Sequence, residues 1–229
     1  MSRYKHLFFD LDRTLWDFEK NSRISLLEMY QNMGIDNYVP SVDLFLSLFD
    51  KYNAMMWREF ERGNISKDIM RVKRFDLILR DVKIKNIDFA KELNNAYLKI
   101  CPSKPHLFDK AQETLTMLSE KYVLHIVSNG FIDIQENKMH ASGIHHFFKE
   151  IITCDVSGYV KPDKRMFDYA LNRCKIDRKQ VLMIGDDYEN DIVGAINSGI
   201  DSCFVDYAKG KCDNATYYIH HLSELTVIL

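Results

Sequence analysis

The sequence lacks the features that mark several large classes of protein. No block of like charge occurs along the chain, and its 31 Lys and Arg are nearly balanced by 33 Asp and Glu. This is not the charge distribution of a protein that binds a nucleic acid polymer. No apolar run approaches the ~18 residues that a membrane span requires. Arg3 and Lys5 lead directly into the apolar residues before Asp10, so we expect no signal peptide.

The cysteines form no recognisable framework. There are five, an odd number, and none are spaced as Cys-x-x-Cys, which argues against a set of disulfides and against a zinc knuckle. They are Cys101, Cys154, Cys174, Cys203 and Cys212. We therefore expect reduced thiols in a cytoplasmic protein. With 46% hydrophobic and 28% charged residues, the chain has the composition of a globular protein.

Short apolar runs predict the buried strands of a parallel sheet. They occupy residues 7–9, 123–127, 181–184 and 203–205. Helical stretches are expected at 132–142, 165–175 and 189–198, where glycine past the helix end and proline near the start give the usual punctuation. The alternation of strand and helix predicts an α/β fold with a doubly wound, Rossmann-like parallel sheet.

The residues between the first predicted strand and the later ones show a helical periodicity. Apolar residues recur at steps of three and four within 45–56, 69–79 and 89–100, which is typical of amphipathic helices. Gly34 and Gly63 are expected to break this helical bundle into hairpins. We expect a helical cap at 16–104, inserted into a core formed by 1–15 and 105–229.

Two acids follow the first strand. Side chains alternate along a strand, so Asp10 and Asp12 are expected to project to the same side, about 7 Å apart. Like charges held this close require a cation or a shared proton. The alternative is a solvated turn in which Thr14 starts a helix.

A serine and a lysine stand near later strand ends. Ser128, Asn129 and Gly130 follow the second strand, where helix-start N–H groups and a hydroxyl can bind a phosphate; an ordinary polar turn is the alternative. Lys161 precedes a helix that begins near Pro162. A single lysine is usually solvated, but this one lies between strands whose polar ends point the same way.

The fourth segment, 185–191, contains four acids in six positions after an apolar strand. Acids are favoured near a helix N-terminus for electrostatic reasons alone. Asp186, however, falls at the carboxyl end of its strand, as Asp10 and Asp12 do. Oxygen ligands gathered at the switch point of a sheet suit Mg²⁺.

The four segments, taken in chain order, resemble the four motifs of the haloacid dehalogenase superfamily. These are a D-x-D-x-T strand end, a Ser or Thr after the second strand, a Lys, and a G-D-D-x-x-N-D acid loop. Because Asp12 and Asp186 are both present, the chain resembles the phosphatase branch. The stretches 62–65, 74–75, 128–131 and 158–162 look like those of the pyrimidine 5′-nucleotidases.

The resemblance implies a magnesium-dependent phosphatase acting through an aspartyl-phosphate on Asp10. Asp12 would be the general acid and base. Mg²⁺ would be held by Asp10, the Asp12 carbonyl and Asp186. The phosphoryl oxygens would be held by Ser128, Lys161 and the N–H groups of Asn129 and Gly130, with Asp187 and Asp191 in support. Asp187 and Arg13 stand where relatives often carry other residues.

The implied partner is a small phosphorylated metabolite, with a nucleoside monophosphate expected first. A general sugar-phosphate phosphatase or a phosphosugar mutase would share the same core chemistry. A signalling receiver domain also phosphorylates an aspartate, but it needs no helical insertion and places its acids on different strands. Selectivity would come from the cap and the site mouth, through Arg13, Trp16, Arg71 and Arg74. The last two could equally be solvated arginines.

Overall fold

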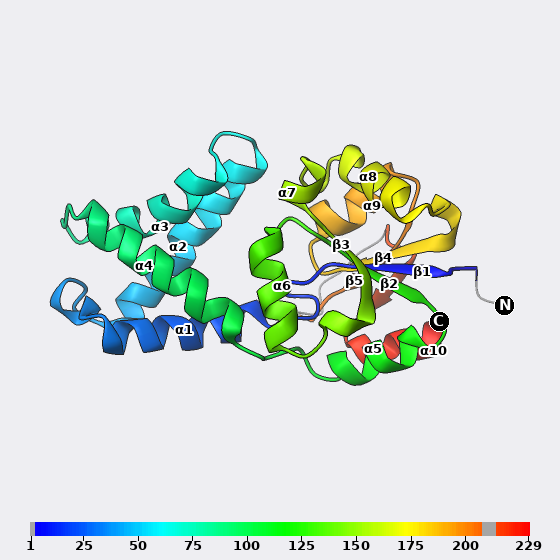
Figure 1. The fold of residues 1–229 in the computed structure, drawn as a ribbon, viewed down its shortest axis with the longest axis horizontal. Coiled ribbons are helices and arrows are strands. Elements are labelled where there is room, and N and C mark those ends of the chain that lie inside the picture. The colour runs from blue at the N-terminus through cyan, green and yellow to red at the C-terminus, as the bar shows by residue number, and fades with distance from the viewer. Residues whose placement is uncertain (1–2, 208–213) are drawn as a thin grey trace. The chain divides into compact units, whose positions relative to one another are not determined.

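The computed structural model describes residues 3–207 and 214–229 (Figure 1). The chain divides into two compact units. Unit 1 comprises the residues up to Phe18 together with Pro105–Leu229, and unit 2 is Glu19–Lys104. Cys212 lies outside the described residues, and the four other cysteines are free thiols.

Unit 1 is built on a sheet of parallel strands in the order β3-β2-β1-β4-β5-β6. The doubly wound sheet predicted from the sequence is confirmed. The strands are β1 (His6–Phe9), β2 (Val123–Ser128), β3 (Phe148–Thr153), β4 (Val181–Gly185), β5 (Asp201–Val205) and β6 (Tyr217–Ile219). β3 was missed because Lys149 and Glu150 interrupt its apolar run, and β6 because it has only three residues.

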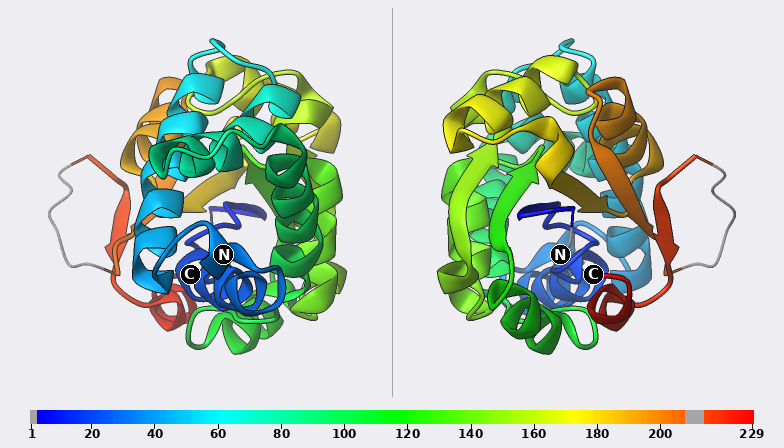
Figure 2. Two further views of the ribbon diagram at one scale, coloured as in Figure 1. Left: turned by 90° about the vertical axis from the view of Figure 1, so that its left-hand side faces the viewer. Right: turned by 90° about the vertical axis from the view of Figure 1, so that its right-hand side faces the viewer.

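Helices cover both faces of this sheet (Figure 2, right). They are α5 (Ala111–Ser119), α6 (Ile132–Ala141), α7 (Cys154–Ser157), α8 (Lys164–Cys174), α9 (Gly194–Asn197) and α10 (Leu225–Ile228). The helix expected at 189–198 instead begins as a π-helix, Tyr188–Val193, and only then continues as α9. Phe8, Val127 and Met183 from the strands pack with Met166 and Phe167 of α8 in one buried cluster.

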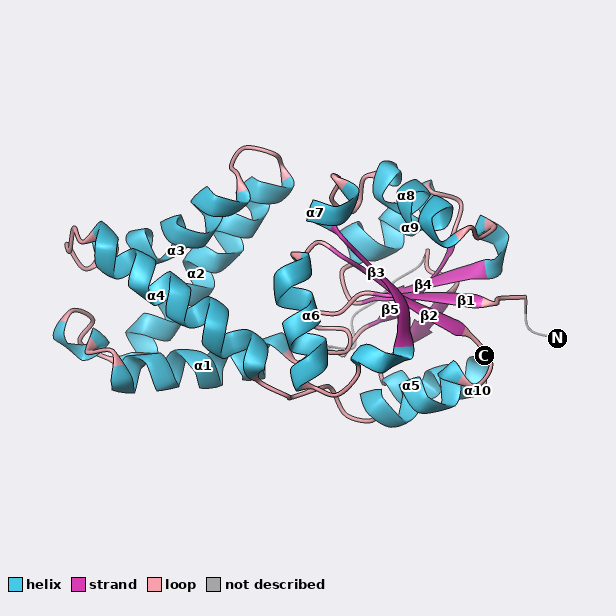
Figure 3. Cartoon of the chain, viewed as in Figure 1, coloured by secondary structure: helices cyan, strands magenta, loops and turns pink. Residues whose placement is uncertain are grey.

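Unit 2 consists of helices and loops, and all of its residues are described (Figure 3). α2 (Val42–Glu61), α3 (Lys67–Asp81) and α4 (Ile87–Ile100) each begin at a side-chain cap, provided by Ser41, Ser66 and Asn86. α1 (Phe18–Asn32) lies within the predicted helical cap but shows no apolar repeat of its own, since polar residues such as Asn21, Ser22 and Ser25 occupy its buried positions. Short 3₁₀ segments lie at 35–37, 101–103, 145–147, 178–180 and 222–224.

The two chain segments at the limits of unit 1 pair with each other. Trp16 and Leu107 form an antiparallel bridge, and the Phe108 N–H donates to the Leu15 carbonyl at 2.9 Å. Trp16 is fully buried in unit 1, whereas the sequence analysis placed it in the cap. Among the described residues, no helix has the length and apolar character needed to cross a membrane.

His125 is a buried titratable residue in the middle of β2. Its Nε2 lies 3.3 Å from His6 Nδ1 and its Nδ1 lies 3.4 Å from Cys174 Sγ, and its ring meets that of Phe8 edge-on. Burial, with smaller contributions from His6 and Lys149, lowers the pKa of His125 to about 4. His125 is therefore neutral in the folded protein near neutral pH.

We expect His125 to make the folded state acid-sensitive. An unfolded chain binds the proton near pH 6.5 and the folded chain only near pH 4, so stability should fall as pH decreases through this interval. Between pH 7 and pH 5 the parent should lose up to about 2 kcal/mol more than His125→Gln. Urea unfolding at both pH values measures the difference. Equal losses in the two proteins would contradict the expectation.

Candidate active site

Residues in or after three neighbouring strands meet at one buried ammonium group, that of Lys161. Its Nζ donates to Asp10 Oδ1 at 2.6 Å, to Asp191 Oδ1 at 2.6 Å and to the Val127 carbonyl at 2.8 Å. Burial disfavours the charge on Lys161, but the two carboxylates outweigh it and raise the pKa above its usual value. Lys161 is therefore not the solvated lysine that its residue type alone would suggest.

Three acids lie close together here, and two of them, Asp10 and Asp191, contact this ammonium group. Asp10, Asp186 and Asp191 each place a carboxylate oxygen within 4.8 Å of the others. Burial and the neighbouring Asp191 raise the pKa of Asp186 to about 7, and burial also raises the pKa values of Asp10 and Asp191. One lysine cannot balance three ionised carboxylates, and the raised pKa values reflect the cost of keeping all three charged without a further cation. The cluster offers only oxygen ligands. This combination suits a hard divalent cation.

Asp191, predicted from the sequence to have a supporting role, is fully buried and bonded through both carboxylate oxygens. Its Oδ1 accepts from Lys161 and its Oδ2 accepts from the Asp187 N–H at 3.1 Å. A Cβ on Gly185 would overlap the Asp191 carboxylate, so only glycine fits at that position. The Asp187 side chain itself is exposed and caps the π-helix by accepting from the Asn190 N–H at 2.9 Å.

Thr14 joins the loop after β1 to the loop after β4. Its Oγ1 donates to Asp186 Oδ1 at 2.6 Å and accepts from the Asp186 N–H at 3.1 Å. The Thr14 carbonyl accepts from the Tyr207 hydroxyl at 2.8 Å, and Tyr207 stacks on Phe108. Thr14 was predicted only as a possible helix start. Tyr207 was not predicted as part of the site, because it lies almost two hundred residues away in the chain.

Asp12 does not join the acid cluster. β1 ends at Phe9, so strand alternation no longer governs residue 12. The Asp12 carboxylate meets α6, where Lys138 Nζ lies 2.6 and 2.7 Å from its two oxygens and Gln135 Nε2 lies 2.9 Å from Oδ2. Burial would raise the pKa of Asp12, but Lys138 and Gln135 together lower it. The two carboxylates thus have different partners, Lys161 for Asp10 and Lys138 with Gln135 for Asp12.

The serine segment lies against the same helix. Ser128 Oγ accepts from Gln135 Nε2 at 2.7 Å and from the Gly130 N–H at 3.1 Å. The Asn129 side chain holds the backbone of Lys161, accepting from its N–H at 2.6 Å and donating to its carbonyl at 3.0 Å. In this structure the Gly130 N–H, expected to face a phosphate, is bonded to Ser128 Oγ.

The four residues expected to set selectivity have different surroundings. Arg13 is exposed, with φ of 66°, and its guanidinium lies 4.5 Å from the Phe18 ring centre. Trp16 is fully buried. In unit 2, Arg71 is half-buried on α3, whereas Arg74 is buried and donates to Asn53 Oδ1 at 2.7 Å. Arg74 is thus not a solvated arginine.

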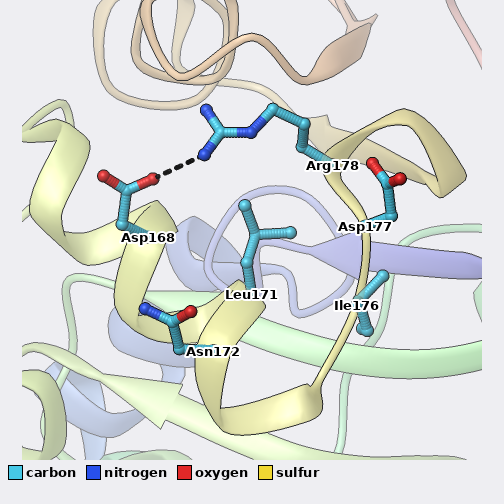
Figure 4. A pocket seen from close by; sticks show the side chains of 6 residues that line it. All are labelled: Asp168, Leu171, Asn172, Ile176, Asp177 and Arg178. Carbon is cyan, nitrogen blue, oxygen red and sulfur yellow. Dashed lines mark hydrogen bonds and ion pairs between the residues drawn. The ribbon is translucent and has the colours of Figure 1, made fainter.

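A separate hollow lies on unit 1 beside α8 and the start of β4 (Figure 4). It contains none of the residues named for the site. Arg178, on its wall, is held by the Ser198 carbonyl at 2.7 Å and by Asp168 Oδ1 at 3.4 Å. The lining residues are Asp168, Leu171, Asn172, Ile176, Asp177 and Arg178.

Comparison with known proteins agrees with this geometry. The family model described as haloacid dehalogenase-like hydrolase matches residues 7–205. The HAD-hydrolase YfnB of Bacillus subtilis is 30% identical over 100% of this chain and 97% of its own length. The crystal structure of YfnB bound to magnesium has a TM-score of 0.89 at 28% identity, covering 100% of this chain and 99% of that one.

Two further relatives are named for the phosphate esters that they hydrolyse. The pyrimidine 5′-nucleotidase YjjG of Escherichia coli is 27% identical over 89% of this chain and 86% of its own length. A glyceraldehyde 3-phosphate phosphatase of Methanothermobacter thermautotrophicus is 30% identical over 88% of this chain and 85% of its own. The family match begins in β1, includes all of unit 2 and ends in β5, and the protein belongs to the haloacid dehalogenase-like hydrolases.

Proposed function

We propose that this phosphatase-type hydrolase cleaves small phosphate monoesters with Mg²⁺ and an aspartyl-phosphate intermediate on Asp10. The observation that carries the proposal is the cluster of Asp10, Asp186 and Asp191 around Lys161 at the carboxyl ends of the parallel strands. Nucleophile, metal ligands and a phosphate-binding cation would then share one edge of the sheet, where open α/β sheets bind their ligands.

The acid cluster fits a magnesium ion. It supplies hard oxygen donors. Burial penalises the negative charge of its carboxylates when no ion is bound. Asp10, Asp186 and the Asp12 carbonyl would hold the ion. When bound, it would neutralise the nucleophile and the phosphate so that they can approach.

The chain's own residues would carry the rest of the reaction. An Asp10 oxygen attacks phosphorus while the bond to the ester oxygen breaks. Lys161 and the Ser128 hydroxyl hold the phosphoryl oxygens as their charge shifts. Asp12, whose pKa Lys138 and Gln135 lower, must enter the step protonated; it gives that proton to the departing oxygen and regains one from the water that releases phosphate from Asp10. The proton count is balanced over the cycle.

For the substrate, we propose a nucleoside monophosphate, with pyrimidine nucleotides first. The relative YjjG, named a pyrimidine 5′-nucleotidase, and the stretches that resemble such enzymes support this choice. A sugar-phosphate phosphatase is the second candidate, favoured by the glyceraldehyde 3-phosphate phosphatase relative. A receiver domain is no longer a serious alternative, because Asp10 and Asp12 follow one strand and the chain is a hydrolase by family.

The nucleophile is tested by Asp10→Asn. Because an amide is a poor nucleophile and lacks the negative charge, hydrolysis of p-nitrophenyl phosphate with Mg²⁺ should fall by about a thousandfold or more. Asp168→Asn, which changes an acid in a surface ion pair, is the matched control and should keep the parent rate. Residual activity within about tenfold of the parent in Asp10→Asn would rule out Asp10 as the nucleophile.

The central ammonium group is tested by Lys161→Met in metal-free protein. Removing it leaves two buried carboxylates without their partner, which should lower the free energy of unfolding by about 3–5 kcal/mol. Lys164→Met removes an exposed pair with Asp168 and should cost less than about 1 kcal/mol. Urea unfolding of both variants gives the comparison. Similar values for the two would mean that Lys161 does not hold the strand ends together.

Substrate choice is tested by a panel of phosphorylated metabolites assayed with Mg²⁺. We expect a higher kcat/KM for uridine and cytidine monophosphates than for glyceraldehyde 3-phosphate, because selectivity depends on differences in transition-state binding outside the phosphate. Equal values for nucleotides and sugar phosphates would leave a general phosphatase. A clear preference for glyceraldehyde 3-phosphate would favour the second candidate.

A further inference from the structure

Two polar residues of α6, Gln135 and Lys138, are buried next to the proposed site. They are three positions apart and therefore share one face of the helix. Their exposed fractions are 0% and 6%. Burying an amide and an ammonium group is unfavourable unless both find partners, and both partners found here belong to the proposed reaction: Asp12 and Ser128.

Lys138 restricts the Asp12 carboxylate to one orientation. Its Nζ contacts both carboxylate oxygens, at 2.6 and 2.7 Å. The same Nζ lies 4.6 Å from the centre of the Trp16 ring, and Trp16 is fully buried. The ammonium group is thus held between an aromatic face and the carboxylate, so neither member of the pair can turn freely.

Gln135 links Asp12 to Ser128. Its Nε2 donates both hydrogens, one to Asp12 Oδ2 at 2.9 Å and one to Ser128 Oγ at 2.7 Å. Its Oε1 is buried and accepts no hydrogen bond from the described residues. The amide therefore keeps the orientation that serves its two acceptors. A Cβ on Gly130 would overlap this amide, which explains the glycine two residues after Ser128.

The direction of the Ser128 hydroxyl follows from this arrangement. Its oxygen already accepts two hydrogen bonds, from Gln135 Nε2 and from the Gly130 N–H. A hydroxyl has two acceptor lone pairs and one proton. With both lone pairs occupied, the Ser128 proton remains available to donate to a ligand oxygen.

We propose that Gln135 and Lys138 are positioning residues that fix the Asp12 carboxylate and orient the Ser128 hydroxyl as a donor. The inference rests on the proposed phosphatase function and adds two residues to it. The Gln135 amide then sets the distance between Asp12, which protonates the departing oxygen, and Ser128, which binds a phosphoryl oxygen. A small displacement of the Asp12 carboxylate or the Ser128 hydroxyl should slow the reaction without unfolding the protein.

The experiment compares two esters with different leaving groups. p-Nitrophenyl phosphate departs with little help from an acid, whereas an alkyl ester such as glycerol phosphate needs the proton. In Lys138→Met, kcat for the alkyl ester should fall at least about tenfold more than kcat for the aryl ester, with KM little changed. Lys138→Arg keeps the charge and should recover part of the loss. Lys164→Met is the surface control.

Gln135→Glu provides a second, nearly isosteric variant that does not depend on Lys138 tolerating replacement. A carboxylate cannot donate, so it would repel Asp12 and draw the Ser128 proton toward itself. KM should rise for both esters and inhibition by inorganic phosphate should weaken, about tenfold each, whereas Gln135→Met should show a smaller effect. Circular dichroism of each variant establishes that it is folded.

The possible results distinguish failure of this inference from failure of the proposed function on which it rests. If the parent hydrolyses neither ester, or Asp10→Asn equals the parent, the proposed function fails and this inference fails with it. If the parent hydrolyses both esters but Lys138→Met leaves their ratio unchanged and Gln135→Glu leaves phosphate inhibition unchanged, the function stands and the positioning role is overturned. Equal losses on both esters in a folded Lys138→Met would likewise reduce Lys138 to a structural residue.

Discussion

The buried ammonium of Lys161 is the interaction on which the rest of the site depends. Removing such a charge from water is costly, and only a complete set of acceptors offsets the penalty. Asp10 from β1, Val127 from β2 and Asp191 after β4 provide that set. The strand order places β1 between β2 and β4 and so brings these acceptors to one place. The Asn129 side chain bonds both the N–H and the carbonyl of Lys161 and so helps to hold this lysine in position.

The charges of the site divide into two groups with different properties. Around Lys161, three carboxylates share one cation and burial raises their pKa values. Around Lys138, a single carboxylate is matched by a single cation, and the pKa of Asp12 is lowered. The first group has a deficit of positive charge, which a divalent ion can supply. The second is balanced as an ion pair, so the Asp12 side chain does not need that ion.

The elements predicted correctly from the sequence are those marked by an uninterrupted local pattern of residues. Strands with continuous apolar runs were found, as were the residues at their carboxyl ends, because parallel strands bring those ends to one edge. Contacts between distant segments could not be predicted. Gln135 and Lys138 look like ordinary polar residues of an amphipathic helix until the loop after β1 is placed beside α6. The π-helix was likewise invisible, since it depends on the Asp187 cap and the enclosed Asp191.

Arg74 shows why residue type alone is a poor guide to specificity. Its guanidinium lies beside the rings of Phe49 and Tyr97, 4.9 and 4.7 Å from their centres. It forms no ion pair among the described residues, and its Nε is buried without a hydrogen-bond partner. Aromatic faces can stabilise such a cation, and its stem adds apolar packing, so Arg74 contributes to the interior of unit 2. Selectivity is better sought in exposed side chains, and Arg13 is exposed one residue after Asp12.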